Sequence, residues 1–221
     1  MIISTGRKYI FVHIPKTGGT ALSVALEQRA MADDILIGDT PKAIRRRKRV
    51  ATLNAAGRLW KHSTLADIDG VLDPQTMAQM FVVTLVRNPW DRLVSYYHWL
   101  RVQSFDHPAV SLAKSLEFSA FLNAPVTRSS IQHHPFGSYV TDPAGQDRCD
   151  LFIRLEHFAD DVAPFEAHLG FSLNPLPVHN TSHRSRDWRG YYSDADRDLV
   201  ADLCAKDIHR FGYCFDDAPV R

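Results

Sequence analysis

The stretch that most constrains the fold of this chain is residues 9–22, YIFVHIPKTGGTAL. Residues 9–14 form an apolar run of β-branched and aromatic side chains, which predicts a buried strand. Pro15 should end that strand, because proline does not donate to a β-ladder. A glycine-containing loop (16–20) follows, and the apolar spacing beyond it predicts a helix over residues 20–31. A strand, a glycine loop and a helix N-terminus in this order are typical of sites that hold an anionic group.

The order of residues inside the loop narrows the kind of anion. Lys16 adds a full positive charge, but it precedes Gly18 and Gly19, whereas the lysine of a Walker A loop follows its glycines. His13 stands where that loop would have its first glycine. An ordinary ATP or GTP loop is therefore disfavoured, although a phosphate-type ligand is not. The alternative is a plain strand–turn–helix in which a threonine of the loop only caps the helix.

Composition sets the class of protein. The 221 residues are 45% hydrophobic and 23% charged, with a formal net charge of +1, which excludes a generally basic nucleic-acid binder. The three cysteines contain no C-x-x-C pair, so neither a zinc site nor a disulfide framework is indicated. No apolar stretch approaches the roughly 20 residues of a membrane span, and no signal-peptide pattern precedes the first strand. We expect a cytoplasmic protein with a single domain over residues 1–221.

A second strand and helix follow in the middle of the chain. Residues 81–86, FVVTLV, form a continuous apolar run of the parallel-sheet kind. Asn88 suits an N-cap and Pro89 suits the first helical position, so a helix should begin there and carry Ser95 two turns further on. Arg87 then lies at the carboxyl end of a central strand, where ligands bind in open α/β sheets. Its alternative role is a structural ion pair.

His62 is the histidine whose placement suggests chemistry. Ser63 or Thr64, followed by Asp67, predicts the start of a short helix with an acidic residue in its first turn. His62 would then end an extended segment just before a helix, where α/β active sites gather. The alternative is an ordinary polar histidine whose hydrogen bonds are satisfied.

Residues 13–20, HIPKTGGT, and 86–97, VRNPWDRLVSYY, together resemble the sulfotransferases that use 3′-phosphoadenosine 5′-phosphosulfate. The resemblance is greatest to the carbohydrate branch that includes the heparan sulfate 2-O-sulfotransferases, and the block 61–64 resembles the segment that carries the catalytic histidine. It implies an α/β fold with a P-loop-type central parallel sheet flanked by helices. Residues 101–148 would be an irregular helical excursion that binds the acceptor.

The same resemblance implies a role for each site residue. Lys16 and the loop to Thr20 would bind the 5′-phosphosulfate, Arg87 and Ser95 the 3′-phosphate, and His62 would be the general base. Segment 179–184 resembles a late loop that closes over the nucleotide. The candidate catalytic residues are His62 and Lys16, with His13, His98, His133 and His134 as substitutes for the base. The candidate donor-binding residues are Lys16, Thr17, Gly18, Gly19, Thr20, Arg87, Ser95, Ser182 and Arg184.

The implied reaction transfers a sulfuryl group to an acceptor hydroxyl, with a carbohydrate as the expected acceptor, and leaves 3′,5′-adenosine bisphosphate. No metal is expected, because His133 and His134 have no further ligand at suitable spacing. No nucleic-acid partner and no transmembrane segment are expected, and a bacterial-type cytoplasmic enzyme fits best. Residues 45–49, RRRKR, are either a solvated face or a docking surface for an anionic substrate or membrane headgroups.

Two other functions stay open at this point. One is a small-molecule phosphotransferase that uses ATP and magnesium, and the other is a non-catalytic relative that binds a nucleotide or polysaccharide. The rest of the chain predicts a strand at 150–156, a helix over 158–169 closed by Gly170, and a terminal helix within 191–215.

Overall fold

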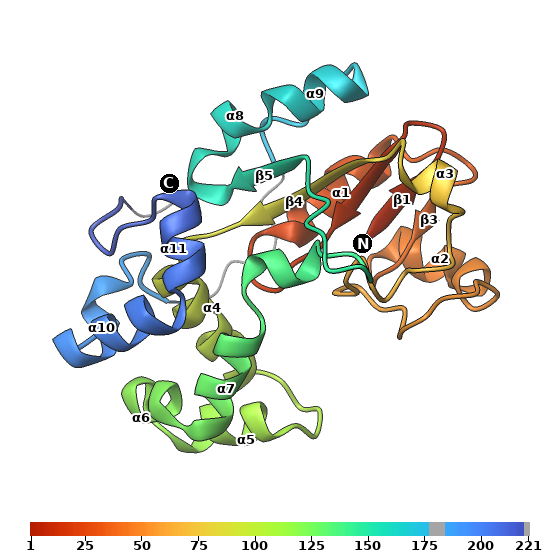
Figure 1. The fold of residues 1–221 in the computed structure, drawn as a ribbon. Coiled ribbons are helices and arrows are strands. Elements are labelled where there is room, and N and C mark those ends of the chain that lie inside the picture. The colour runs from red at the N-terminus through yellow and green to blue at the C-terminus, as the bar shows by residue number, and fades with distance from the viewer. Residues whose placement is uncertain (177–183, 219–221) are drawn as a thin grey trace. The chain divides into compact units, whose positions relative to one another are not determined.

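The computed structural model describes residues 1–176 and 184–218. These residues form two compact units (Figure 1), which are described separately. The first unit comprises residues 1–86 and 136–176, and the second comprises residues 87–135 and 184–218. The expectation of one domain over residues 1–221 stays a prediction.

The first unit is built around a sheet of five strands, namely β1 (Ile2–Ser4), β2 (Tyr9–Val12), β3 (Ile35–Leu36), β4 (Phe81–Val86) and β5 (Leu151–Arg154). Its helices are α1 (Gly19–Gln28), α2 (Pro41–Val50), α3 (Pro74–Met77), α8 (Phe158–Asp161) and α9 (Ala163–Leu169), with the short 3₁₀ helices η1 (Phe136–Tyr139) and η2 (Leu155–His157).

The strand order is β3-β1-β2-β4-β5. Strands β2, β4 and β5 are parallel, whereas β1 pairs antiparallel with both β2 and β3. Val12 lies opposite Thr84 in the ladder, so the carboxyl ends of the parallel strands β2 and β4 lie on the same side of the sheet. The predicted α/β class, with a central sheet flanked by helices, is confirmed. The antiparallel β1 is an addition that the sequence analysis did not predict.

One face of this sheet packs against helices α1, α8 and α9. Side chains alternate between the two faces of a strand, so Tyr9 and Phe11 of β2 point to the same side as Val83 and Leu85 of β4. They share a core with Leu22, Leu26, Ile153, Phe158, Val162 and Phe165. The rings of Tyr9 and Phe165 meet edge to face, with 5.4 Å between their centres.

Two predicted helices of the first unit have different bounds in the structure. α1 ends at Gln28 because the Asp34 carboxylate accepts the Met31 N–H at 2.8 Å, which turns the chain away. The predicted helix over 158–169 is divided, since Pro164 lies in the first turn of a new helix, α9. Gly170 closes α9 at φ 74°, as predicted.

The helix predicted after Ser63 does not form, so His62 lies in a turn. The side chains of Thr64 and Asp67 do accept each other's backbone N–H, at 2.7 and 3.1 Å. However, the Asp67 carbonyl then accepts the N–H of Gly57 at 2.9 Å. The Asp67 carbonyl is therefore engaged in a long-range bond, whereas in a continuing helix it would accept the N–H four residues later.

The second unit is helical. It contains α4 (Pro89–Arg101), α5 (Pro108–Ser115), α6 (Phe118–Asn123), α7 (Pro125–His133), η3 (Arg189–Tyr191), α10 (Asp194–Leu203) and α11 (Ala205–Phe211). The part of segment 101–148 that lies in this unit is thus mostly regular helix rather than irregular. The predicted terminal helix is broken at Cys204.

The start of α4 is as predicted. The Asn88 side chain accepts the Trp90 N–H at 3.1 Å, and Pro89 occupies the first helical position. The inner face of α4 packs in a core of aromatic and aliphatic side chains with α5, α6 and α10.

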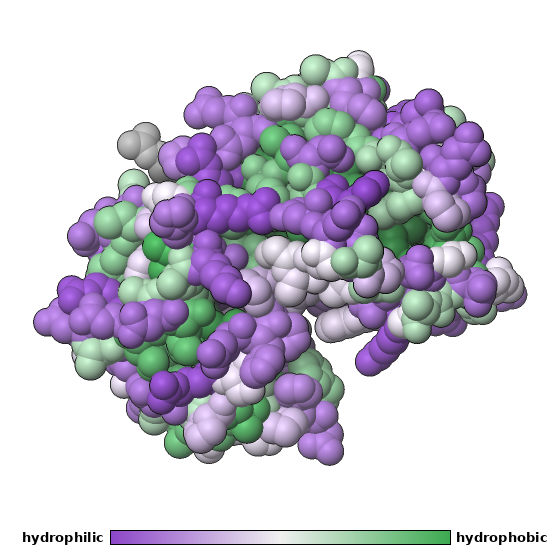
Figure 2. All heavy atoms as spheres, in the orientation of Figure 1, coloured by the Kyte–Doolittle hydropathy of each residue, from purple (hydrophilic) through white to green (hydrophobic). Residues whose placement is uncertain are grey.

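Hydrophilic residues spread over the face of the molecule in Figure 2, with apolar residues in patches between them. Among the helices in residues 1–176 and 184–218, none has the length and apolar character needed to cross a membrane.

Candidate functional site

The loop between β2 and α1 takes an unusual backbone path. Lys16 has φ 66° and Gly18 has φ 86°, both in the left-handed region. Non-glycine residues held there cost about 1–3 kcal/mol and cluster at ligand sites. Gly18 is the N-cap of α1, and within the described chain no side chain caps that helix. The Thr17 hydroxyl instead donates to the Ile14 carbonyl at 2.9 Å, so the alternative in which a loop threonine caps the helix is wrong.

The loop glycines are required by packing inside the first unit. A Cβ atom on Gly19 would lie 2.1 Å from Cδ2 of His13, and one on Gly18 would lie 2.8 Å from Cδ1 of Leu155. The His13 ring therefore occupies the space that any other residue at position 19 would need. His13 is only 6% exposed, and burial lowers its pKa well below the ordinary value.

His62 is held by the residue that precedes the loop. Its Nδ1–H donates to the His13 carbonyl oxygen at 2.7 Å, because a carbonyl only accepts. The rings of His13 and His62 meet edge to face, with 4.7 Å between their centres. The Trp60 ring also meets the His62 ring edge to face, with 5.0 Å between the centres. Burial lowers the pKa of His62 to about 4. At neutral pH His62 is therefore uncharged, with its proton on Nδ1 and a lone pair on Nε2 that accepts a proton.

Thr20, at the start of α1, lines a small polar cavity together with His13, Ser23 and Glu27. Its volume of about 10 Å³ has room for roughly one water molecule. The Thr40 hydroxyl binds the Glu27 carboxylate at 2.6 Å, and burial raises the pKa of that carboxyl. This side of the loop is an internal polar pocket.

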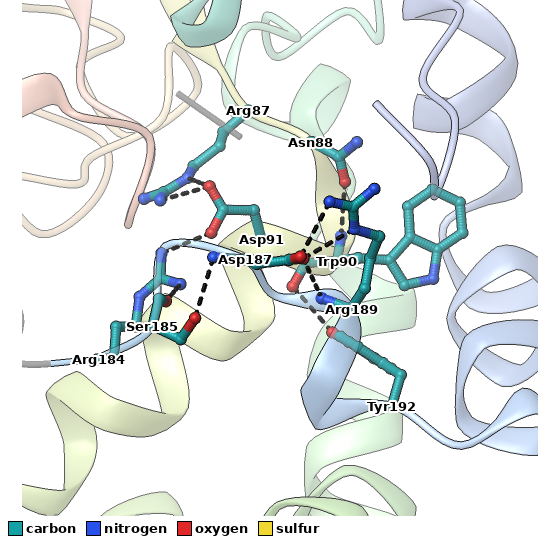
Figure 3. A network of polar contacts seen from close by, with 9 residues as sticks. All are labelled: Arg87, Asn88, Trp90, Asp91, Arg184, Ser185, Asp187, Arg189 and Tyr192. Atoms are coloured by element: carbon teal, nitrogen blue, oxygen red, sulfur yellow. Dashed lines mark hydrogen bonds and ion pairs between the residues drawn. The ribbon is translucent and has the colours of Figure 1, made fainter. Parts of the chain in front are cut away.

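A second cluster lies in the second unit, where two guanidinium groups share one carboxylate (Figure 3). Arg87 donates through Nε and Nη2 to Oδ2 of Asp91, at 2.8 and 2.6 Å. Arg184 donates through Nη2 to Oδ1 of the same residue at 2.5 Å. Side-chain exposure is 13% for Arg87, 7% for Arg184 and 3% for Asp91. The three side chains thus hold an excess of positive charge in a mostly buried place.

Helix α4 sets the spacing of this cluster. Asp91 and Ser95 are four residues apart, so they lie on one face of the helix, and His98 follows on that face three residues later. Burial, and then the nearby guanidinium of Arg184, lower the pKa of His98. Nε2 of His98 is buried without a hydrogen-bond partner among the described residues. This helix face therefore carries polar side chains beside the arginine cluster.

The predicted site residues fall into two sets. Lys16, Thr17, Gly18, Gly19, Thr20 and His62 belong to the first unit, and Arg87, Ser95 and Arg184 belong to the second. Ser182 lies outside the described residues. Within the first set the structure joins the loop to His62 through His13, and within the second it joins Arg87 to Arg184 through Asp91.

Two residues of these clusters were not assigned from the sequence. Asp91 stands four residues from both Arg87 and Ser95, a spacing that could have identified it as the partner of the arginine. His13 was named only as a substitute base, whereas its backbone carbonyl positions His62. The exposed His133 and His134 bind the carbonyls of Ser129 and Ser130 at 2.7 and 2.8 Å. In the described ranges, no group of three side chains is arranged to hold a metal ion.

No protein-family model matches this chain, and no curated protein matches it. Among solved structures it is similar to the mouse sulfotransferase SULT7A1 complexed with PAP, at 17% sequence identity and a TM-score of 0.49. The alignment covers 92% of this chain and 85% of the mouse chain.

Proposed function

We propose that this protein is a sulfotransferase that uses 3′-phosphoadenosine 5′-phosphosulfate. The observation that carries the proposal is the Arg87–Asp91–Arg184 cluster. Two mostly buried guanidinium groups converge on a single carboxylate, and such a cationic place favours an anionic ligand. A phosphate suits it, because two guanidinium groups can donate to its several oxygens. The cluster therefore supports a site for the 3′-phosphate, which distinguishes this donor from ATP.

The loop of the first unit fits the other end of such a donor. Lys16 brings a full positive charge to the start of α1, and the first turn of α1 contains no acidic residue. The N-terminus of a helix favours anions through its backbone N–H groups. The donor supplies the sulfuryl group. Lys16, with the N–H groups of residues 17–20, would stabilise negative charge on the oxygen that leaves with the 5′-phosphate.

His62 is proposed as the general base. Its Nε2 would accept the proton of the acceptor hydroxyl, while Nδ1–H keeps its bond to the His13 carbonyl. That bond fixes the ring orientation and the tautomer, and it strengthens when the ring becomes positively charged. The His13 backbone thus prepares His62 for the reaction that the proposal requires.

The acceptor is proposed to be a hydroxyl compound, with a carbohydrate as the class that the sequence resemblance favours. We also propose that residues 101–148 contribute to acceptor binding, that Ser95 and Ser182 contribute to donor binding, and that the protein works in the cytoplasm without a metal. Each of these proposals rests on the sequence motifs.

The decisive test is calorimetric titration of the whole chain with 3′,5′-adenosine bisphosphate, with 5′-AMP as the matched control. EDTA is present in both titrations. We expect the bisphosphate to bind at least roughly tenfold more tightly, as a charged hydrogen bond of about 1.5–3 kcal/mol predicts. Equal affinities, or tighter binding of ATP with magnesium, would contradict the proposal and favour the phosphotransferase.

A further inference from the structure

A groove of about 500 Å³ lies along the edge of the sheet in the first unit, and neither His62 nor the loop of residues 16–20 lines it. The edge strand β3 and the residues after it form one wall. Helix α2 forms the second wall, and residues 59–61 form the third. We call it the β3–α2 groove. Its volume is in the range of about 300–1,000 Å³ that small-molecule sites occupy.

The floor of the β3–α2 groove is mainly apolar. Leu36, Ile37, Val50 and Leu59 line it. Trp60 completes the lining and remains 43% exposed, although it is a large aromatic residue. Exposed aromatic surface inside a concave site is the usual platform for the flat or apolar part of a ligand.

The arginines of the basic run of α2 have two different roles, which depend on the side of the helix on which each lies. Arg46 donates to the carbonyls of Met31 and Asp34, at 2.8 and 3.1 Å, and Arg49 donates to the carbonyl of Ala32. These two arginines hold α2 against the segment that precedes β3. They therefore serve structure, and the run as a whole is not simply a solvated face.

Arg47 points to the other side of the helix and lines the groove. It stands four residues after Ala43 and three before Val50, which line the groove with it. Its guanidinium has no hydrogen-bond or ion-pair partner within the described part of the chain. Lys61, the other cation of the lining, is paired with Asp39 at 2.6 Å. Among the residues that line the groove, Arg47 therefore contributes the uncompensated charge, and the Arg58 guanidinium lies 5.6 Å from the centre of the Trp60 ring.

We infer that the β3–α2 groove binds an amphipathic anion, a ligand with a flat apolar body and one carboxylate, sulfate or phosphate group that Arg47 receives. Charge complementarity selects the anion, and Trp60 with the aliphatic floor selects the apolar body. The Trp60 ring lies 5.0 Å from that of His62. A ligand here would therefore lie next to the proposed base, as the non-reacting part of an acceptor must. That acceptor role rests on the proposed function, with the hydroxyl of an amphipathic anion in place of the carbohydrate that the sequence resemblance favours.

The test uses two probes that differ in one charge, 6-hydroxy-2-naphthoate and the neutral 2-naphthol. Without nucleotide, we expect the anion to bind the wild-type chain roughly 10-fold or more tightly than the neutral probe, as a charged hydrogen bond predicts. Arg47→Ala should remove this preference while leaving 2-naphthol binding unchanged. Arg45→Ala is the matched control, since Arg45 is exposed on the same helix but does not line the groove. Bound anion should also quench tryptophan emission in the wild type but not in Trp60→Phe.

Equal affinity for the two probes, or a preference that survives Arg47→Ala, would overturn the inference. Titration of the same samples with 3′,5′-adenosine bisphosphate separates the two proposals. Naphthoate binding without bisphosphate binding would refute the sulfotransferase and the acceptor role, yet support the groove as an anion site. Bisphosphate binding without naphthoate binding would support the sulfotransferase and refute the groove as an anion site. With labelled donor, 6-hydroxy-2-naphthoate should be sulfated, and Arg47→Ala should raise its KM with little change in kcat.

Discussion

The two clusters of candidate residues are built on opposite physical principles. Around His13 and His62 the two imidazole rings are uncharged, and their geometry depends on close packing of His13 against Gly19. Around Asp91 the site is charged, and its geometry depends on ion pairs with Arg87 and Arg184. The first arrangement suits a proton acceptor that must stay neutral, whereas the second suits retention of a polyanion. Substitutions should therefore affect turnover in one cluster and ligand affinity in the other.

The largest expected effect is on turnover. His62→Ala removes the proposed base, and general-base catalysis commonly contributes about 10²–10⁴-fold in rate. We expect kcat for sulfuryl transfer to fall by that amount, with unchanged affinity for 3′,5′-adenosine bisphosphate. His209→Ala, at an exposed histidine of α11 outside the candidate site, is the control and should retain full activity. Wild-type turnover in His62→Ala would show that another group is the base.

A smaller effect, on affinity, is expected in the second cluster. Arg87→Ala should weaken binding of 3′,5′-adenosine bisphosphate by about 1.5–3 kcal/mol, or roughly 10- to 100-fold, as lost charged hydrogen bonds predict. Arg87→Lys should recover only part of the loss, because lysine keeps the charge but not the planar fork. Calorimetry measures both variants, with Arg101→Ala as the control on the same helix. Unchanged affinity in Arg87→Ala would refute the phosphate role.

Packing around His13 gives the third prediction. Gly19→Ala forces a methyl group into the space of the His13 ring and should lower the free energy of unfolding by about 1–3 kcal/mol, a typical cost of overpacking. Urea unfolding measures it. Gly190→Ala is the control, since a Cβ there meets nothing within 4 Å. The double variant with His13→Ala should lose less than the sum of the single losses. Strict additivity would mean that the ring does not cause the strain.

The smallest effect concerns pH. Since burial lowers the pKa of His62 to about 4, the base should stay deprotonated, and kcat/KM should stay level from about pH 8 to about pH 5. The rate should fall only as the pH drops toward that pKa. A pH–rate profile of the wild-type chain measures this. A fall centred near the ordinary histidine value of about 6.5 would show that His62 is more solvated than the structure has it.

The sequence predicted the elements whose signals are local and mutually consistent. The strand of residues 81–86, the Asn88 N-cap and the helix after the glycine loop are of this kind, because apolar runs, caps and prolines act within a few residues. Two other features depend on long-range contacts instead. The Gly57 N–H donates to the Asp67 carbonyl, and turns form where a helix was predicted. Strand β1 is only three residues long, which is too short for a clear apolar pattern.

The candidate site shows the same division. The loop and Arg87 could be identified from their motifs. The reason why position 19 is a glycine could not, because a loop glycine is equally expected for ligand access and for packing. Only the structure shows the His13 ring against it. The basic run could not be assigned from composition either, since Arg46 and Arg47 differ only in the side of α2 on which they lie.

The way α2 is attached has a consequence for motion. Ala43 is its one buried residue, so little apolar surface holds the helix, and the bonds from Arg46 and Arg49 to backbone carbonyls provide much of the attachment. Such contacts exchange readily with water, and segments with few buried apolar contacts open at a free energy far below that of global unfolding. The amides of α2 should therefore exchange hydrogen well before those of β2 and β4. We therefore expect the α2 wall of the β3–α2 groove to open before the sheet does, so that the groove admits ligands of different width while the sheet stays intact.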